Sequence, residues 1–316
     1  MKKTAIILVN WNSYDLTAQC IRSLQQILDP VSITIILVDN NSEDGSGAAI
    51  KSTFPDVHFI QANDNKGFTG GNNLGIAYAI QEKFEYTLLL NNDTTVAKDF
   101  LLPLLHFMEE HPEAGAVQPL IYYHHQPTLI WNGGSYYHEW LGHPSIQYIG
   151  KKLSDTPLQN QRPVSVDWIT GCAFLVRTSL LTQIGGLSNN LFMYFEDIDI
   201  SLRIREKGYQ LWLVPQSAIW HVGGMSNKNK EKTREGFVNQ VVHYLNIRNR
   251  IWILKQYTRW FYLPTVVIFN SIYISGILLY FLARLRWGKF QTACKALLDG
   301  LLGQIEYITF SSTAAK

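Results

Sequence analysis

Two aliphatic runs near the N-terminus constrain the fold of this chain more than any other feature. Residues 5–9 and 33–38 are apolar at every position rather than at alternate positions. Strands of this kind belong to parallel sheets, because helices cover both faces of such a sheet. The stretch between the two runs is therefore predicted to be a helix, and residues 5–38 a β-α-β unit. Its apolar side chains recur at helical spacing, at Leu16, Cys20, Leu24 and Ile27.

Further segments extend the same pattern. Residues 57–60 and 86–90 predict two more strands, and residues 72–84, with apolar side chains at helical spacing, predict the helix between them. The chain is therefore assigned to the α/β class, with a mostly parallel central sheet flanked by helices. Ligands of such sheets bind at the carboxyl ends of the strands. The polar residues 135–165 are expected to form a loop or an insertion, and the lysine-rich residues 226–235 are expected to be a loop.

Polar side chains follow three of these strands at the point where each strand ends. Turn chemistry explains any one such cluster, because Asn, Asp and Ser favour local hydrogen bonding after a strand. Three clusters at one edge of a parallel sheet indicate a shared crevice, because the topology brings the carboxyl ends together. The clusters are Asn10-Trp11-Asn12, Asp39-Asn40-Asn41-Ser42 and Asn91-Asn92-Asp93.

Asp93 and His221 are candidates for holding a metal ion. A hard divalent cation such as Mg²⁺ or Mn²⁺ takes one or two carboxylates plus phosphate oxygens and water, so a single Asp is sufficient. His221 ends an apolar run and is followed by Gly223 and Gly224, which permit close backbone approach. A neutral imidazole there can complete the coordination of the same ion. The alternatives are a helix-capping role for Asp93 and an ordinary buried role for His221.

Three acids in four residues, Glu196, Asp197 and Asp199, follow an aromatic-rich run at residues 192–195. Acids at a helix start interact favourably with the helix dipole, and Asp199 and Arg203 are spaced to pair across one helical turn. That pairing accounts for Asp199. Asp197 lies beside large apolar side chains, which raise the pKa of a carboxyl group toward the range of a general base.

A glycine-rich stretch at residues 65–75 precedes a predicted helix and includes Lys66 and Gly67. Its spacing differs from the dinucleotide-binding fingerprint, and it follows the third strand rather than the first. Glycine-rich backbone that leads into a helix N-terminus is a good site for an anion. We expect an anionic group of a ligand to bind here.

The overall charge gives no argument for a nucleic-acid partner. Lys and Arg total 27 and Asp and Glu total 25, for a formal net charge of +2, whereas nucleic-acid-binding domains are strongly basic. Three cysteines, Cys20, Cys172 and Cys294, are far apart in the sequence. Their odd number and wide spacing favour neither a disulfide framework nor a zinc cluster, and a reducing, cytoplasmic compartment fits best.

The C-terminal third changes character at residue 260. Residues 260–283 contain no charged side chain, and basic residues flank the stretch on both sides. A membrane-spanning helix needs about 20 largely apolar residues, so this segment is long enough to cross a bilayer. Its Trp and Tyr residues also suit a helix that lies in the membrane surface. A pair of buried helices in a soluble protein is the third interpretation.

Six motifs in a fixed order carry a family resemblance. They are Val-Asn-Trp-Asn at 9–12, Val-Asp-Asn-Asn-Ser at 38–42, Asn-Lys-Gly-Phe-Thr-Gly-Gly-Asn-Asn at 65–73, Leu-Asn-Asn-Asp at 90–93, Phe-Glu-Asp-Ile-Asp at 195–199 and Trp-His at 220–221. The chain resembles glycosyltransferase family 2, and within it the bacterial rhamnosyltransferase-like enzymes that extend cell-surface or lipid-linked glycans. The resemblance covers residues 4 to about 250.

The resemblance implies a GT-A fold, a nucleotide-diphosphate sugar donor (dTDP- or UDP-linked), Mg²⁺ or Mn²⁺ as cofactor, and inversion at the anomeric carbon. Asp197 would be the catalytic base, and Asp93 and His221 would hold the metal. The residues implied around the donor are Asn10, Asn12, Asp39, Asn41, Lys66, Gly67, Asn91, Asn92 and Asp93.

Other parts of the chain are assigned from the same resemblance. The segment at residues 168–172 would border the sugar and the acceptor, whereas Tyr244, Arg248 and Asn249 resemble a family feature near the lipid-facing end. One position departs from the family: the metal motif is usually Asp-x-Asp, and Asn91 stands at its first position. Related enzymes often carry Asn there, so a metal is still expected. The same departure supports an alternative function, a catalytically inactive nucleotide-sugar-binding or scaffold subunit of a glycan assembly complex.

The predicted organisation follows from these assignments. Residues 1–250 are expected to form the transferase domain, with a nucleotide-binding half at 1–100 and a metal and acceptor half at 101–250. Residues 251–316 are expected to be helical and associated with a membrane. Because a polyprenyl-linked acceptor lies at the cytoplasmic leaflet, the enzyme is expected at the cytoplasmic face of the cell membrane, acting on a lipid-linked or polysaccharide acceptor.

Overall fold

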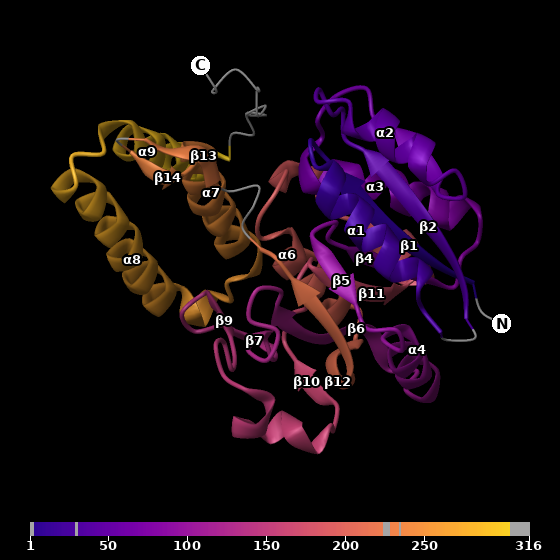
Figure 1. The fold of residues 1–316 in the computed structure, drawn as a ribbon. Helices are drawn as coiled ribbons and strands as arrows, with labels where there is room; N and C mark the ends of the chain where they lie inside the picture. Colours follow the sequence, from indigo (N-terminus) through magenta and orange to yellow (C-terminus); the bar gives the residue numbers. More distant parts are fainter. Residues whose placement is uncertain (1–2, 29–30, 224–227, 234, 304–316) are drawn as a thin grey trace. The chain divides into compact units, whose positions relative to one another are not determined.

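The computed structural model describes residues 3–28, 31–223, 228–233 and 235–303 (Figure 1). The chain divides into two compact units. The sheet unit comprises Met1–Tyr136, Ile146–Phe192 and Glu196–Gly223. The helical unit comprises Tyr137–Ser145, Met193–Phe195 and Gly224–Lys316. The boundary at residue 250, between the expected transferase domain and the expected membrane-associated region, stays a prediction.

A mixed sheet forms the centre of the sheet unit. Four parallel strands stand in the order β3-β2-β1-β4, and β11 pairs antiparallel with both β4 and β6. Next to β6, β12 runs parallel to it, while β10, β5 and β7 add antiparallel pairs. The strands are β1 (Lys3–Asn10), β2 (Ser32–Asp39), β3 (His58–Gln61), β4 (Tyr86–Leu90), β5 (Thr94–Val96), β6 (Ala114–Tyr123), β7 (Ile130–Asn132), β10 (Val164–Val166), β11 (Ala173–Arg177) and β12 (Gln210–His221).

Helices cover both faces of this sheet, and the burial of β1 shows why its strand is apolar throughout. Ile6 and Leu8 belong to the hydrophobic cluster on one face, and Ala5 and Ile7 belong to the cluster on the other. A strand that is buried on both sides needs apolar side chains at odd and even positions alike. The predicted β-α-β unit and the α/β class, with helices flanking a central sheet, are therefore confirmed. The sheet is parallel over β3-β2-β1-β4 and mixed beyond β4.

Each face has its own set of helices. The first cluster takes side chains from α1 (Tyr14–Gln25), α2 (Ser46–Thr53) and α4 (Leu101–Glu110). The second takes them from α3 (Gly67–Gln81), α5 (Thr178–Ile184) and α6 (Glu196–Glu206). The sequence pattern did not predict α2, which has only one large apolar side chain, Ile50, among its buried residues.

Helix α3 begins at Gly67, five residues before the predicted start, so the glycine-rich stretch is mostly helix rather than loop. The glycines let the helix approach β1 closely. A Cβ atom at Gly71 would lie 2.8 Å from Val9 Cγ1, and one at Gly75 would lie 2.6 Å from Ile7 Cγ2. The glycines at 71 and 75 therefore serve helix–strand packing, which explains them without a ligand.

Residues 135–165 and the lysine-rich segment both contain regular structure. Within residues 135–165, β8 (Ser135–His138) and β9 (His143–Ile146) form a two-stranded sheet, followed by the 3-10 helices η1 (Leu153–Asp155) and η2 (Pro157–Asn160). In the lysine-rich segment, β13 (Lys228–Thr233) pairs with β14 (Gly236–Val238). Residues 135–165 thus form an insertion with regular structure of its own. The expectation of a loop was wrong over residues 228–233, because paired backbone hydrogen bonds, rather than apolar periodicity, form this short strand. Residues 226, 227 and 234 of the lysine-rich segment lie outside the described residues.

The C-terminal part of the helical unit consists of α7 (Gln240–Tyr257), η4 (Trp260–Tyr262), α8 (Leu263–Ala283) and α9 (Trp287–Leu302). The residues Trp260–Ala283 are long and apolar enough to cross a membrane. Four residues of α8 are buried, and they recur at helical spacing: Val266, Asn270, Ile274 and Phe281. Most of the remaining apolar side chains are exposed, which does not fit the interpretation as a buried core helix.

Candidate active site

The carboxyl ends of four strands meet at one edge of the sheet. The register pairs Asn10 at the end of β1 with Asp39 at the end of β2, and β4 ends immediately before Asn91. Strand β12 ends at His221, which pairs with Thr94 of β5. This pairing brings the loop after β4 next to the end of β12, although the two are distant in sequence.

Asp93 and His221 contact each other at this edge. Asp93 Oδ1 lies 3.0 Å from His221 Nε2, and the His221 side chain is 6% exposed and that of Asp93 13% exposed. Two backbone amides fix the carboxylate: Gly223 N–H donates to Asp93 Oδ2 at 3.1 Å, and Val222 N–H donates to the Asp93 carbonyl at 3.0 Å. One carboxylate oxygen and one ring nitrogen therefore face each other at this edge.

The charges of this pair depend on each other. Burial disfavours ionised Asp93, but the hydrogen bond and charge of His221 and the Gly223 N–H outweigh burial and lower the Asp93 pKa. Burial likewise disfavours protonated His221, but Cys172 and Asp93 outweigh it and raise the pKa of His221.

The two asparagines before Asp93 have different surroundings. Asn91 Nδ2 lies 3.3 Å from His221 Nε2, so the Asn91 amide is part of the Asp93–His221 cluster. Asn92 Nδ2 donates instead to Thr17 Oγ1 of α1 at 2.7 Å. Of the two, only Asn91 places an amide beside the ring nitrogen that faces Asp93.

The donor atoms of Asp93 and His221 fit a divalent cation. Two neighbouring ligands of an octahedral ion at about 2.1 Å from it are about 3.0 Å apart, and the two donor atoms are separated by 3.0 Å. Within the described ranges, however, no group of three or more His, Cys, Asp or Glu side chains gathers at one point. The pair could therefore hold Mg²⁺ or Mn²⁺ only together with ligand oxygens and water.

Asp197 lies at the start of α6 with its carboxylate held by two backbone amides. Gly171 N–H donates to Asp197 Oδ2 at 3.2 Å, and Ile198 N–H donates to Oδ1 at 2.9 Å. Burial raises the pKa of Asp197 to about 6, although these two N–H groups favour the ionised form. A carboxyl group with this pKa is ionised near neutral pH and still basic enough to accept a proton from a hydroxyl group.

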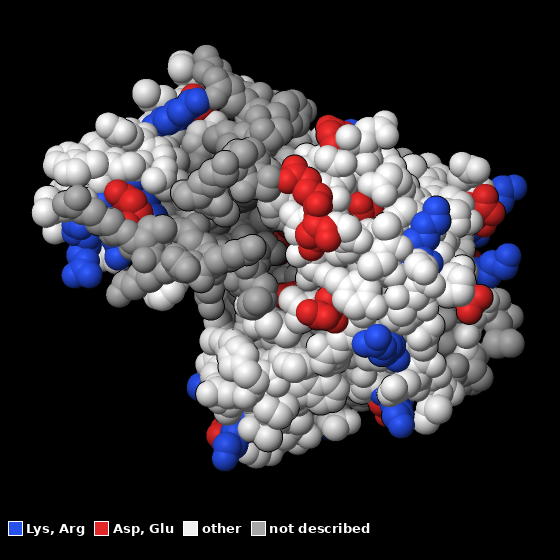
Figure 2. Space-filling view, turned by 45° about the horizontal axis from the view of Figure 1, so that its top comes forward, with Lys and Arg blue, Asp and Glu red and all other residues white. Residues whose placement is uncertain are grey.

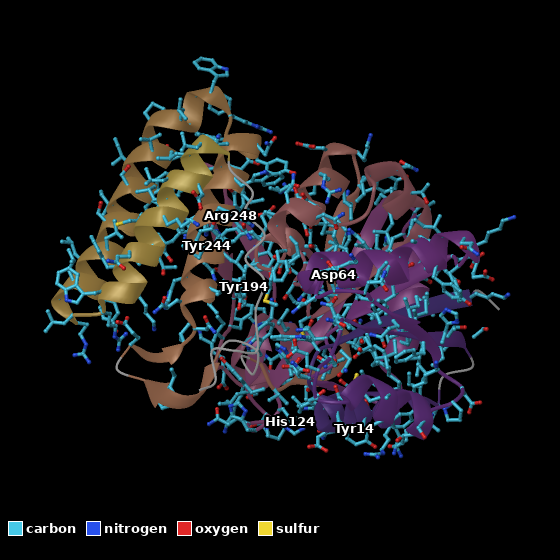
Figure 3. The ribbon with its side chains drawn as sticks, turned by 90° about the horizontal axis from the view of Figure 1, so that it is seen from above. Tyr14, Asp64, His124, Tyr194, Tyr244 and Arg248 are labelled. Atoms are coloured by element: carbon cyan, nitrogen blue, oxygen red, sulfur yellow. The ribbon has the colours of Figure 1, made fainter. Side chains whose placement is uncertain are left out.

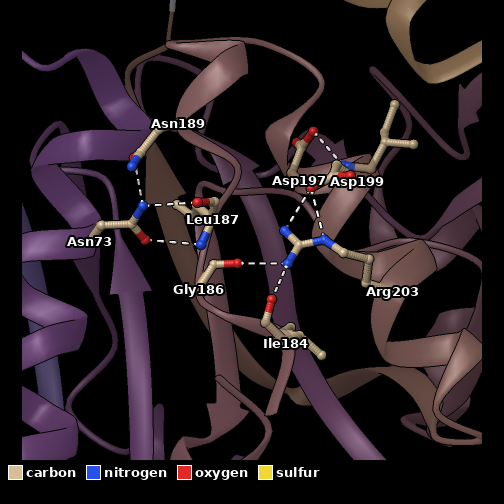
Figure 4. A network of polar contacts seen from close by, with 9 residues as sticks. Asn73, Ile184, Gly186, Leu187, Asn189, Asp197, Asp199 and Arg203 are labelled. Atoms are coloured by element: carbon tan, nitrogen blue, oxygen red, sulfur yellow. Dashed lines mark hydrogen bonds and ion pairs between the residues drawn. The ribbon is translucent and has the colours of Figure 1, made fainter. Parts of the chain in front are cut away.

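A buried ion pair anchors α6. Arg203 Nη2 lies 2.6 Å from Asp199 Oδ2, as the i,i+4 spacing predicted (Figure 4). Arg203 Nη1 also donates to the carbonyls of Ile184 and Gly186 at 2.8 Å each. The pair therefore fixes the helix that carries Asp197 to the end of α5.

Asp197 and the Asp93–His221 pair are linked by two consecutive residues. Gly171 N–H bonds to Asp197, and the carbonyl of the next residue, Cys172, accepts the Asn91 N–H at 2.9 Å. The Cys172 thiol also interacts with the His221 imidazole. The Asp197 carboxylate and the Asp93–His221 pair are therefore connected through two adjacent residues, Gly171 and Cys172, whose Cα atoms are about 3.8 Å apart.

The predicted nucleoside residues include two that are completely buried within the protein. The Asn10 amide donates to Asp39 Oδ1 at 2.9 Å and to Ser42 and Ser46 at 3.0 Å each, and it accepts from Thr17. Asn10 is 0% exposed and Asp39 is 2% exposed. These two side chains therefore stabilise the loops after β1 and β2, and their polar groups bond within the protein rather than facing a ligand.

The hydrogen bonds of this network determine the ionisation of Asp39. Burial opposes its ionisation, but hydrogen bonds from Ser42, Asn10 and Gln61 outweigh burial and lower its pKa. Asn12 extends the network, because its side-chain oxygen accepts the Glu43 N–H at 2.8 Å. Asn41 is exposed with a φ of 61°, a conformation that Asn tolerates better than most residues.

Lys66 and Gly67 lie at the start of α3, where the structure supplies protein acceptors for the first amides. Lys66 N–H donates to Asn40 and Gly67 N–H donates to Asn65, while Thr69 N–H donates to the Phe192 carbonyl at 3.1 Å. These three backbone amides already donate to groups of the protein, so they are not available for the anion that was predicted to bind here. The Lys66 ammonium lies 2.5 Å from Asp64 and is 39% exposed.

Sequence reasoning missed several residues that organise this site. Asn40 donates to Asn65 and to the Gly67 carbonyl, and Gln61 donates to Asp39 at 2.9 Å. Ser42 contacts Asn10, Asn12 and Asp39. The signal for Ser42 and Asn40 was their place in the motif after β2, whereas nothing in the sequence pattern distinguished Gln61.

Comparison with known proteins identifies the family of this chain. The family model described as "Glycosyl transferase family 2" matches residues 5–185, more than half of the chain. An N-acetylglucosaminyl-diphospho-decaprenol L-rhamnosyltransferase of Mycobacterium tuberculosis is 27% identical over 208 residues, which cover 60% of this chain and 66% of that protein. The chain thus spans slightly less than two thirds of that relative's length.

Two further similarities cover more of the chain. The low-salt glycan biosynthesis hexosyltransferase Agl10 of Haloferax volcanii is 27% identical over 253 residues, 78% of this chain and 73% of that protein. A crystal structure of GalNAc-T7 with UDP, GalNAc and Mn²⁺ has a TM-score of 0.55 at 17% identity, covering 69% of this chain and 43% of that one. The chain therefore belongs to glycosyl transferase family 2, as a rhamnosyltransferase-like glycosyltransferase with the GT-A fold.

Proposed function

We propose that this protein is an inverting, metal-dependent glycosyltransferase that moves a sugar from a nucleotide-diphosphate donor to a hydroxyl group of a lipid-linked or cell-surface glycan. One observation carries the proposal: Asp93 and His221 lie in contact at 3.0 Å, and the Gly171–Cys172 segment connects them to Asp197. A cation site and a general base therefore lie at the same edge of the sheet.

The chemistry needs a base on one side of the anomeric carbon and charge neutralisation on the other. Asp197 accepts the proton of the acceptor hydroxyl as that oxygen forms a bond to the anomeric carbon, and the bond from that carbon to the diphosphate breaks. The nucleoside diphosphate leaves in a single displacement, which inverts the configuration. A divalent cation held by Asp93 and His221 supplies charge neutralisation for the leaving diphosphate.

The donor is proposed to lie over the loops after β1 and β2. Asn10 and Asp39 fix the shape of these loops through Ser42, and Asn12 and Asn41 lie at their more accessible side. Lys66 is partly exposed and supplies positive charge for the ribose and diphosphate region. UDP- and dTDP-linked sugars are both candidates, with dTDP-rhamnose favoured because the mycobacterial relative is named a rhamnosyltransferase.

The acceptor is proposed to be attached to a lipid at the cytoplasmic face of the cell membrane. The mycobacterial relative's name gives N-acetylglucosaminyl-diphospho-decaprenol, a lipid-linked sugar, as its acceptor. In this chain, α8 exposes a row of large apolar side chains, among them Val267, Ile268, Ile272 and Leu279 at 53–69%. Burying this surface in lipid gives the enzyme access to such an acceptor.

The experiment is a donor assay with the full chain in detergent. Release of nucleoside diphosphate is measured with UDP- and dTDP-linked sugars, with Mn²⁺, with Mg²⁺ and with EDTA. We expect turnover that requires a divalent cation and a single preferred donor. Asp197→Asn should lower transfer about 10²–10⁴-fold and leave the donor dissociation constant unchanged, whereas Asp93→Ala should weaken cation-dependent donor binding.

A matched control is Glu110→Gln, which changes an exposed acid on α4 and should leave transfer unchanged. If Asp197→Asn transfers sugar at the wild-type rate, the assignment of Asp197 as the base is wrong. If the chain binds a nucleotide sugar, never releases nucleoside diphosphate, and supports a partner's activity equally well with Asp197→Asn, the inactive scaffold function is correct.

A further inference from the structure

The segment that leads into Asp197 has an unusual backbone. Three non-glycine residues, Phe192, Tyr194 and Phe195, have positive φ angles of 61°, 70° and 68°. Each such residue costs free energy, so the conformation persists only where the surrounding structure holds it. The short 3-10 helix η3 (Asn189–Leu191) precedes this segment and α6 follows it.

Asn249 of α7 holds the middle of this segment. Its side-chain Nδ2 donates to the carbonyl of Met193 and to the carbonyl of Tyr194, both at 2.8 Å. Asn249 is 0% exposed. Both protons of one buried amide are therefore used to hold two consecutive peptide groups of the strained segment.

The neighbours of Asn249 fix the orientation of its amide. Arg248 Nε donates to Asn249 Oδ1 at 2.8 Å, so the oxygen faces Arg248 and the nitrogen faces the two carbonyls. Tyr244 and Arg248 are neighbours on α7 (Figure 3). The Arg248 guanidinium lies over the Tyr244 ring, and the Tyr244 hydroxyl donates to Asp299 at 2.6 Å. All four side chains are buried, so the amide has one available orientation.

Phe192, the first residue of the segment, is held by the start of α3. The Phe192 carbonyl accepts the Thr69 N–H at 3.1 Å, and the ring of Phe192 occupies the space that a Cβ atom at Gly67 would need. Residues 192–195 are thus fixed at both ends, and Asp197 follows two residues later. A change in this segment would displace the start of α6.

We propose that Asn249 is a positioning residue for the transfer reaction, which holds the strained residues 192–195 so that the Asp197 carboxylate stays at the Gly171 N–H. This inference rests on the proposed function, because it assigns Asn249 an effect exerted through the base. Displacing a catalytic group by about 1 Å can cost about 10²-fold in rate. Neither Asn249 nor the segment needs to contact the donor.

The experiment compares Asn249→Ala and Asn249→Asp with Asn246→Ala in the full-length enzyme. Asp at 249 keeps the size of the side chain and an acceptor for Arg248, but it replaces the two donated bonds by a carboxylate oxygen that faces two carbonyl oxygens. Asn246 is the matched control, because it is an Asn on the same helix whose amide donates to the Val242 carbonyl within α7. Steady-state kinetics, thermal unfolding and amide hydrogen exchange are measured for each.

We expect both 249 variants to lower kcat about 10–100-fold with the donor KM within about twofold of wild type, and Asn246→Ala to leave both unchanged. Hydrogen exchange in peptides covering residues 192–198 should accelerate in the 249 variants and not in the control. In the Asp197→Asn background, Asn249→Ala should cause no additional loss, because a residue acting through the base cannot act when the base is absent.

Three results would overturn the inference. They are wild-type kcat in both 249 variants, an equal fold-loss of rate in the Asp197→Asn background, and a loss of donor binding in parallel with a lowered melting temperature, which would indicate a purely structural role. Failure of the proposed function is distinguishable, since it appears as full activity in Asp197→Asn whatever the 249 variants do. If the rate of Asp197→Asn is too low for the double variant, the hydrogen-exchange comparison decides alone.

Discussion

Asp197 combines two features that a general base needs, a raised pKa and a fixed position. The pKa is raised because the carboxylate is buried, and the position is fixed because Gly171 and Ile198 donate to its two oxygens. The aromatic run before it predicted the first feature. The second depends on a backbone amide from a distant segment, which no local pattern contains.

This pKa gives the transfer reaction a defined pH dependence. The proton-accepting form of Asp197 predominates above the raised pKa of about 6, so kcat/KM should fall about tenfold per pH unit below pH 6 and level off above it. In folding the sign is opposite: because the folded state binds this proton more tightly than the unfolded chain, the contribution of Asp197 to stability declines as pH rises from about 4 to 6.

The measurement is kcat/KM of the wild-type enzyme between pH 4.5 and 8 in a constant-ionic-strength buffer. Circular dichroism at each pH serves as the control that the protein remains folded. A profile that stays flat down to pH 4.5 would contradict the assignment of Asp197 as the base.

Helix α3 illustrates how one composition supports two interpretations. In the sequence its glycines predict an anion-binding loop, yet in the structure they lie within a helix that packs closely against β1. The short distance between α3 and β1 explains these glycines. Glycine is the residue that allows the closest approach of a helix to a strand, and it also suits a tight loop, so the sequence leaves both uses open.

Gly75→Ala is expected to destabilise the protein although alanine is the better helix former. The new methyl group would lie 2.6 Å from Ile7 Cγ2, and overpacking of this kind costs about 1–3 kcal/mol, which exceeds the gain of about 1 kcal/mol in helix propensity. The control is Gly276→Ala in α8, where a Cβ atom has nothing within 4 Å. Thermal unfolding should show a lower midpoint for the first variant and an equal or higher midpoint for the second.

At the scale of the whole chain, polar and apolar surfaces differ between its parts. Charged side chains are scattered over the described residues drawn in Figure 2, whereas α8 has no charged residue over its length. Its exposed apolar side chains supply the membrane association proposed above. The identity of the bound membrane and the side on which the enzyme acts remain part of that proposal.

Membrane attachment is tested by Ile268→Lys with Ile272→Lys, two side chains that are 61% and 69% exposed. A lysine on an exposed helix face costs little free energy in water. At the centre of a bilayer it costs about 2.5–3.5 kcal/mol per residue in insertion free energy. The wild-type chain should therefore sediment with membranes and the double variant should not. Point substitutions are preferable to deleting the residues after Tyr257, because deletion would remove α9 and its Asp299 contact with Tyr244.

The control is Leu28→Lys with Leu102→Lys, which adds the same charge at exposed apolar positions of the sheet unit. It should sediment like the wild type. Finding the wild-type chain soluble without detergent would contradict the membrane proposal.

The sequence by itself determined the parallel strands, the edge where the site lies and the family. Those features depend on local patterns, because strands buried on both faces must be apolar throughout and their carboxyl ends meet at one edge. Tertiary structure decided which polar groups remain available. It paired Asp93 with His221, enclosed Asn10 and Asp39 in a hydrogen-bond network, and used Asn249 to hold residues 193 and 194. A hydrogen bond between distant segments has no periodicity along the chain, so only the folded arrangement could reveal it.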